Sequence, residues 1–98
     1  MRLRLALFGL AGLTALAGCD VPPQGTNLED VARFQSAVAS IGCDMVGESD
    51  FLPVELQAGL TRQQTTDLVA YHVATEQAVS LENGGARLVV GACAPETA

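Results

Sequence analysis

The sequence predicts a small, single α+β domain in which two main helices pack on a C-terminal β-hairpin. Two observations lead to this prediction. Apolar residues recur at steps of three and four between residues 28 and 41, which is the period of an amphipathic helix. Near the other end, Asn83-Gly84-Gly85-Ala86 separates two short apolar segments, a pattern that is typical of a hairpin turn.

The first helix is expected to run from about residue 28 to residue 41. Asn27 is a good N-cap, and Glu29 and Asp30 fall in the first turn, where the helix dipole favours acidic side chains. Gly42 is expected to end the helix. The apolar face, which we expect to pack in the core, consists of Leu28, Val31, Phe34, Val38 and Ile41.

The middle of the chain predicts shorter elements. Residues 43–46 could form a short strand, and residues 50–59 indicate a short helix or a turn that ends at Gly59, with Pro53 in the first turn of such a helix. A second long helix is expected from Arg62 to residue 77 or 78, with Thr61 as its cap.

The second long helix is apolar on two sides, so it is either well buried or offers a contact surface. Val69 and Val73 lie together on one of these sides. We therefore take them as the candidate contact residues for a partner protein.

The hairpin strands are expected at residues 79–82 and 87–90. A two-residue loop pairs Val79 with Leu88, a four-residue loop pairs Leu81 with Leu88, and a three-residue loop would mix the two faces. Both accepted registers place the same residues on the core side, namely Val79, Leu81, Leu88 and Val90. The order of elements resembles the winged-helix arrangement, a likeness of fold only.

The start of the chain contains a different kind of signal. Two arginines precede an apolar run that ends in Leu16-Ala17-Gly18-Cys19. This segment resembles the signal sequence of a bacterial lipoprotein, with Cys19 as the lipidated residue. A helix over this run would be about 20 Å long, too short for a permanent span of the bilayer. The resemblance implies that the thiol of Cys19 receives a diacylglyceryl group, that the chain is cut before Cys19, and that the new amino terminus is acylated.

The resemblance divides the chain into four parts: a signal peptide (1–18), a lipidated cysteine with a proline-rich tether (19–26), a small globular domain (27–94) and a tail (95–98). With Cys19 lipidated, Cys43 and Cys93 remain as a pair. In an oxidising envelope compartment such a pair favours a structural disulfide. A metal site and a redox pair are the alternatives, although no Cys-x-x-Cys spacing is present.

Charge and composition exclude several functions. The mature chain would hold three arginines, no lysine and all 11 acidic residues, a formal net charge of −8. This charge argues against nucleic-acid binding and against attraction to an anionic membrane surface, so the lipid would have to hold the protein there. The acidic residues lack the spacing of a calcium loop, and no metal or other cofactor is predicted.

The sequence also indicates no catalytic residues. His72 is the only histidine, and no nucleophile pattern accompanies it, so we expect a half-buried structural side chain. We therefore expect a non-enzymatic accessory or structural subunit, lipid-anchored on the periplasmic side of the cell membrane and docked on an inner-membrane protein or complex. Asp20 resembles an inner-membrane retention signal, with the outer membrane as the alternative. A small periplasmic module that binds a metal or a cell-wall component is the second interpretation.

Overall fold

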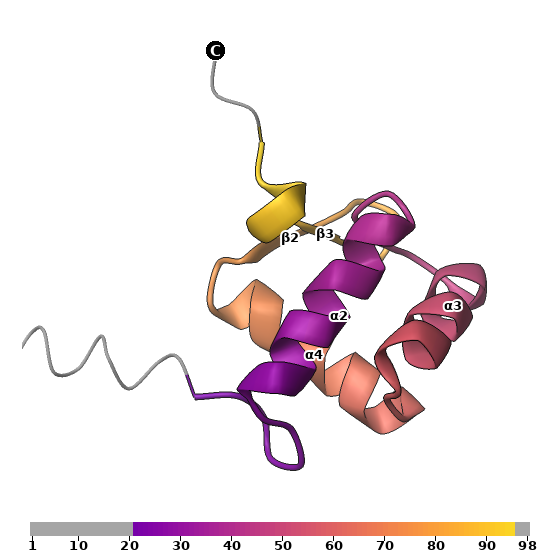
Figure 1. The fold of residues 1–98 in the computed structure, drawn as a ribbon. Helices are drawn as coiled ribbons and strands as arrows, with labels where there is room; N and C mark the ends of the chain where they lie inside the picture. The colour runs from indigo at the N-terminus through magenta and orange to yellow at the C-terminus, as the bar shows by residue number, and fades with distance from the viewer. Residues whose placement is uncertain (1–20, 96–98) are drawn as a thin grey trace, which may run out of the picture.

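The computed structural model describes residues 21–95, and the predicted signal peptide and Cys19 lie outside this range. The domain contains three α-helices and a three-stranded antiparallel sheet, so the predicted α+β class is confirmed (Figure 1). The helices and strands are α2 (Leu28–Ser40), β1 (Asp44–Met45), α3 (Glu48–Ala58), α4 (Arg62–Ala74), β2 (Ala78–Ser80) and β3 (Ala86–Leu88), and they are followed by the short 3-10 helix η2 (Gly91–Cys93).

Both predicted helix caps are present as capping boxes. At the start of α2, the Asn27 side chain accepts a hydrogen bond from the amide of Asp30 at 2.8 Å, and the Asp30 carboxylate accepts one from the amide of Asn27 at 3.0 Å. Thr61 and Gln64 make the same reciprocal pair at the start of α4. Each pair satisfies backbone donors that the first turn leaves without helical partners.

Two helix boundaries differ from the sequence prediction. α3 begins two residues earlier than expected, at Glu48, and Pro53 therefore lies inside the helix and not in its first turn. α4 ends at Ala74 because the chain reverses there: Glu76 has a φ of 63°, and the amide of Gln77 donates to the carbonyl of His72 at 2.7 Å. The apolar residues beyond this point belong to β2 and do not extend the helix.

The hairpin forms, but both predicted registers are wrong. β2 pairs with β3 through Ala78↔Leu88, Val79↔Arg87 and Ser80↔Ala86. The amide of Leu81 donates to the carbonyl of Gly85 at 2.8 Å, which sets this pairing. Leu88 is buried as predicted, but β2 is shifted against it so that Ala78, and not Val79, lies on the core side.

β3 is the central strand of the sheet, with β2 along one edge and β1 along the other. One face of the sheet carries a row across the three strands formed by Asp44, Arg87 and Val79, in which Arg87 and Val79 are exposed and Asp44 is partly buried. The opposite face packs against the helices. The buried apolar core consists of Phe34, Ala37, Val38, Met45, Val54, Ala58, Leu60, Leu68, Ala78, Ala86 and Leu88.

Candidate functional site

The predicted disulfide is present between Cys43 and Cys93. Their Cα atoms lie 5.7 Å apart, and the two residues are 50 positions apart in the sequence. Cys43 is also held by its backbone, since its amide donates to the carbonyl of Val38 and its carbonyl accepts from the amide of Leu88. The bridge therefore joins the end of α2 and the start of β1 to η2.

His72 is fully buried, deeper than the half-buried position expected from the sequence. Its ring lies in the core beside Phe34, with the ring centroids 5.0 Å apart, and edge-on to Tyr71 at 5.3 Å. Both ring nitrogens have polar partners: Nδ1 lies 2.7 Å from the carbonyl oxygen of Leu68, and Nε2 lies 3.0 Å from Nε2 of Gln35.

These partners define the state of the imidazole. A carbonyl oxygen can only accept, so we assign the proton to Nδ1, and Nε2 then accepts a hydrogen bond from the Gln35 amide. Burial lowers the pKa of His72, and the bond to the Leu68 carbonyl opposes this shift only in part. The result is a neutral histidine that fills the core and satisfies both of its nitrogens.

The candidate contact residues Val69 and Val73 are both partly buried and pack against the core. More exposed apolar side chains lie on α3, where Leu52 is 48% exposed and Leu56 is 82% exposed. These two leucines are four residues apart and so share one face of the helix, which we call the α3 stripe. The sequence pattern does not single out the stripe because α3 is apolar on several sides, with Val54 turned into the core.

Ionic contacts border the α3 stripe. Arg62 at the start of α4 pairs with Glu48, at 2.6 Å, and with Glu55 on the neighbouring turns of α3. The guanidinium also lies over the ring of Phe51, 5.1 Å from its centroid. The hydrogen bonds from Arg62 hold the pKa of the Glu48 carboxyl below its usual value. The single positive charge of Arg62 is therefore shared by Glu48 and Glu55 and offsets part of their negative charge on the helix face beside Leu52.

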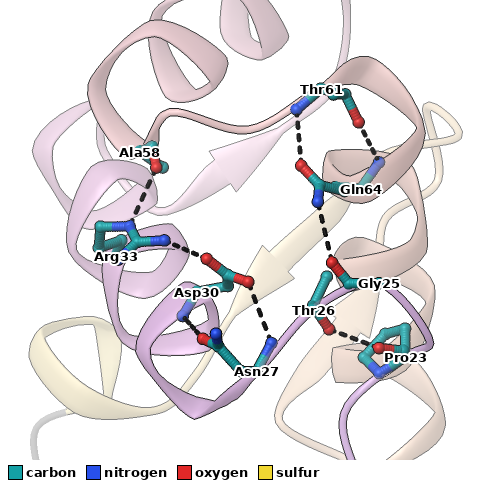
Figure 2. A network of polar contacts seen from close by, with 9 residues as sticks. All are labelled: Pro23, Gly25, Thr26, Asn27, Asp30, Arg33, Ala58, Thr61 and Gln64. Carbon is teal, nitrogen blue, oxygen red and sulfur yellow. Dashed lines mark hydrogen bonds and ion pairs between the residues drawn. The ribbon is translucent and has the colours of Figure 1, made fainter.

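The segment before α2, predicted as part of a tether, forms a turn on the surface of the domain (Figure 2). The Thr26 hydroxyl and amide both donate to the carbonyl of Pro23, at 2.7 and 3.1 Å. Nε2 of Gln64 donates to the carbonyl of Gly25 at 2.9 Å, which fixes the turn to the first turn of α4. Pro22 and Pro23 are partly buried.

The same network holds α2 against the end of α3. Arg33 pairs with the Asp30 carboxylate, and its Nε donates to the carbonyl of Ala58 at 3.1 Å (Figure 2). The start of α2, the end of α3 and the start of α4 therefore meet at one end of the domain. We call this end, formed by residues 21–28 and 61–64, the N-terminal pole. The 3-10 helix η2 lies at the opposite end of the domain (Figure 1).

Three further observations concern residues 21–95 alone. No pocket is found among them. No group of three or more histidine, cysteine, aspartate or glutamate side chains among them is arranged to hold a metal ion. Within the same residues, no helix combines the length and the hydropathy needed to cross a membrane.

Comparisons with protein families, with curated proteins and with solved structures find no match to this chain.

Proposed function

We propose that the chain is a lipid-anchored envelope lipoprotein that acts as a non-catalytic accessory subunit of an inner-membrane protein or complex. The observation that supports this most directly is Leu16-Ala17-Gly18-Cys19 behind a basic and apolar start. The acyl chains on Cys19 would hold the domain on the periplasmic side, because two or more chains anchor a protein stably. Asp20 favours the inner membrane in this proposal.

The buried histidine supports a non-catalytic role. His72 is neutral, and both of its ring nitrogens are bonded within the protein. A general base needs a free nitrogen within reach of a substrate proton. A structural role for His72 explains its burial and its partners together.

We assign the partner contact to the α3 stripe instead of Val69 and Val73. Leu52 and Leu56 are more exposed than the two valines. The acidic side chains next to Leu52 are already paired with Arg62, which lowers the cost of bringing an apolar surface against this face. Covering the stripe would also remove apolar area from water, which favours association.

The lipid anchor is tested with Cys19→Ser in the full-length chain expressed in its native envelope. We expect the variant to lose both the incorporation of a fatty-acid label and its place in the membrane fraction. A Cys19→Ser protein that stays in the membrane fraction after a salt wash would place the anchor elsewhere. Gradient separation of the two membranes tests the location, and recovery wholly in the outer membrane would contradict the inner-membrane assignment.

The partner contact is tested by crosslinking in native membranes with Leu56→Lys and Ala70→Lys. Both substitutions add one positive charge at an exposed helical position, on α3 and on α4 respectively. We expect Leu56→Lys to abolish a crosslink that the wild type forms and Ala70→Lys to retain it. The reverse result would return the contact to α4, where the sequence analysis placed it.

A further inference from the structure

We propose that the turn of residues 23–26 clamps the lipid anchor against the domain, so that the domain rests with its N-terminal pole on the bilayer surface. Val21 and Leu28 would then contact the headgroup region. This inference rests on the proposed lipidation of Cys19 and adds an orientation to it. The surface that the pole contacts is a bilayer of zwitterionic lipid, the same bilayer that holds the lipid anchor of the chain.

The length of chain outside the clamp is the first argument. The Gln64–Gly25 bond and the two bonds from Thr26 to Pro23 fix the turn to α4. Only two residues separate Cys19 from Pro22, which is already partly buried. Such a link reaches about 10 Å when fully extended, whereas a tether free as far as residue 26 would reach about 25 Å. The anchor therefore holds the pole close to the membrane.

The exposed side chains at the pole are the second argument. Val21 is 70% exposed and Leu28 is 72% exposed, and both follow the anchor within ten residues of sequence. A bilayer surface beside Cys19 would cover both side chains, and partial insertion of apolar residues at the headgroup boundary is favourable.

The charges at the pole decide which kind of lipid surface fits. Arg62, within the pole, is paired with Glu48 and Glu55 on α3. At the adjoining start of α2, Asp30 is paired with Arg33, whereas Glu29 is exposed beside Leu28. The mature chain has a formal net charge of −8. Anionic lipid would repel this charge, so contact with the pole is strongest on a zwitterionic surface.

The orientation has a consequence for the partner. Arg33 and Ala58 join the C-terminal end of α3 to the pole, so Leu56 lies in the half of the domain nearest the membrane. The 3-10 helix η2, which lies at the other end of the domain (Figure 1), would then be away from the bilayer. A protein that contacts the α3 stripe would then approach along the membrane surface, as the periplasmic part of an integral protein does.

Tryptophan quenching tests the orientation, because the chain contains no tryptophan of its own. The lipidated protein, expressed from the full-length sequence, is reconstituted in phosphatidylcholine vesicles that contain brominated phosphatidylcholine, with the reporter at Leu28→Trp or Ala92→Trp. Ala92 is exposed in η2, near the C-terminus. We expect at least twofold stronger quenching at position 28 than at position 92. Equal quenching at the two positions in acylated protein would overturn the orientation.

The clamp itself is tested with Gln64→Glu in the Leu28→Trp background. A carboxylate at position 64 still accepts from the amide of Thr61 and preserves the capping box, but it cannot donate to the carbonyl of Gly25. Gln63→Glu is the matched control, since Gln63 is exposed and bonds Asp67 instead of the turn. We expect Gln64→Glu to weaken the quenching at least twofold and Gln63→Glu to leave it unchanged.

The outcomes separate this inference from the function on which it rests. Mass spectrometry of the purified protein shows first whether Cys19 is acylated. An unacylated Cys19 overturns the proposed anchor and the orientation together. An acylated protein in which Gln64→Glu and Gln63→Glu behave alike overturns the clamp alone.

Discussion

Nδ1 of His72 donates a hydrogen bond to the carbonyl oxygen of Leu68, 2.7 Å away and one turn earlier in α4. In a regular helix that carbonyl accepts the amide of residue 72, so the ring adds a second donor to the same oxygen. The other ring nitrogen accepts from Gln35 on α2. The histidine thus links two helices through the core in its neutral form.

The first prediction is that the protein loses stability as the pH falls through the range in which histidine titrates. Burial places the folded-state pKa of His72 below its unfolded value of about 6.5. The unfolded chain then binds more protons than the folded one, so the contribution of His72 is complete above that value and declines below it. Urea unfolding between pH 5 and pH 7.5 should show the decline.

His72→Gln provides the control for this prediction. Glutamine keeps polar atoms in the core and does not titrate, so the variant should be less stable at neutral pH but nearly independent of pH over the same range. Asp44 and Glu48 also have lowered pKa values, but their contributions are lost only at more acidic pH. Parallel pH profiles for the two proteins would contradict the assignment to His72.

The second prediction concerns the Cys43–Cys93 disulfide, which closes a loop across 50 positions of sequence. Reduction should lower the free energy of unfolding by about 2–5 kcal/mol, because the unfolded chain regains the freedom that the bridge removes. Urea unfolding with and without reductant measures the loss in a Cys19→Ser background. The variant with both cysteines replaced by serine should be insensitive to reductant. Two reactive thiols in the unfolded, unreduced Cys19→Ser chain would contradict the bridge.

Local signals in the sequence predicted much of this fold. The caps at Asn27 and Thr61 depend only on residues within one turn, and both formed as expected. The Cys43–Cys93 disulfide was predicted from the number of cysteines and from the oxidising compartment that the lipoprotein resemblance implies, and the structure contains this bridge. These features can be predicted without knowing which other segments pack against them.

Features that are set by the backbone path through turns, or by which segments pack together, were not predicted correctly. The end of α4 and the hairpin register are set by the reversal at Glu76 and by the bond from Leu81 to Gly85. The docking of the turn at Gly25 depends on Gln64, which is 39 residues away in the sequence. The exposure of Leu56 likewise reflects which side of α3 the other helices cover. A pattern of apolar residues alone does not contain this information.

The third prediction contrasts two neighbouring glycines in the hairpin loop. A Cβ atom at Gly85 would lie 2.5 Å from the carbonyl oxygen of Met45 and 2.8 Å from Cα of Val46, so β1 would have to move away from β3. A Cβ atom at Gly84 meets nothing within 4 Å, although its φ of 91° disfavours other residues. Gly85→Ala should therefore lower stability by more than the roughly 1–2 kcal/mol expected for Gly84→Ala.

Thermal unfolding of the two glycine variants, each compared with the wild type, measures this difference. Amide exchange offers a second measurement, because the loss of β1 from the sheet should expose the amide of Leu88, which is bonded to the carbonyl of Cys43. Equal stability of the two alanine variants would show that β1 does not approach Gly85 this closely.

The fourth prediction separates packing from contact on α4. Val69 packs partly buried against the core, whereas its neighbour Ala70 is exposed. Val69→Asp should lower the free energy of unfolding by about 1–3 kcal/mol, because it brings an unpaired charge against apolar neighbours. Ala70→Asp should cost only about 0.7 kcal/mol, the difference in helix propensity. Urea unfolding of both variants measures the contrast, and equal losses would show that Val69 lies on the free surface of α4, available for the partner contact that the sequence alone assigned to it.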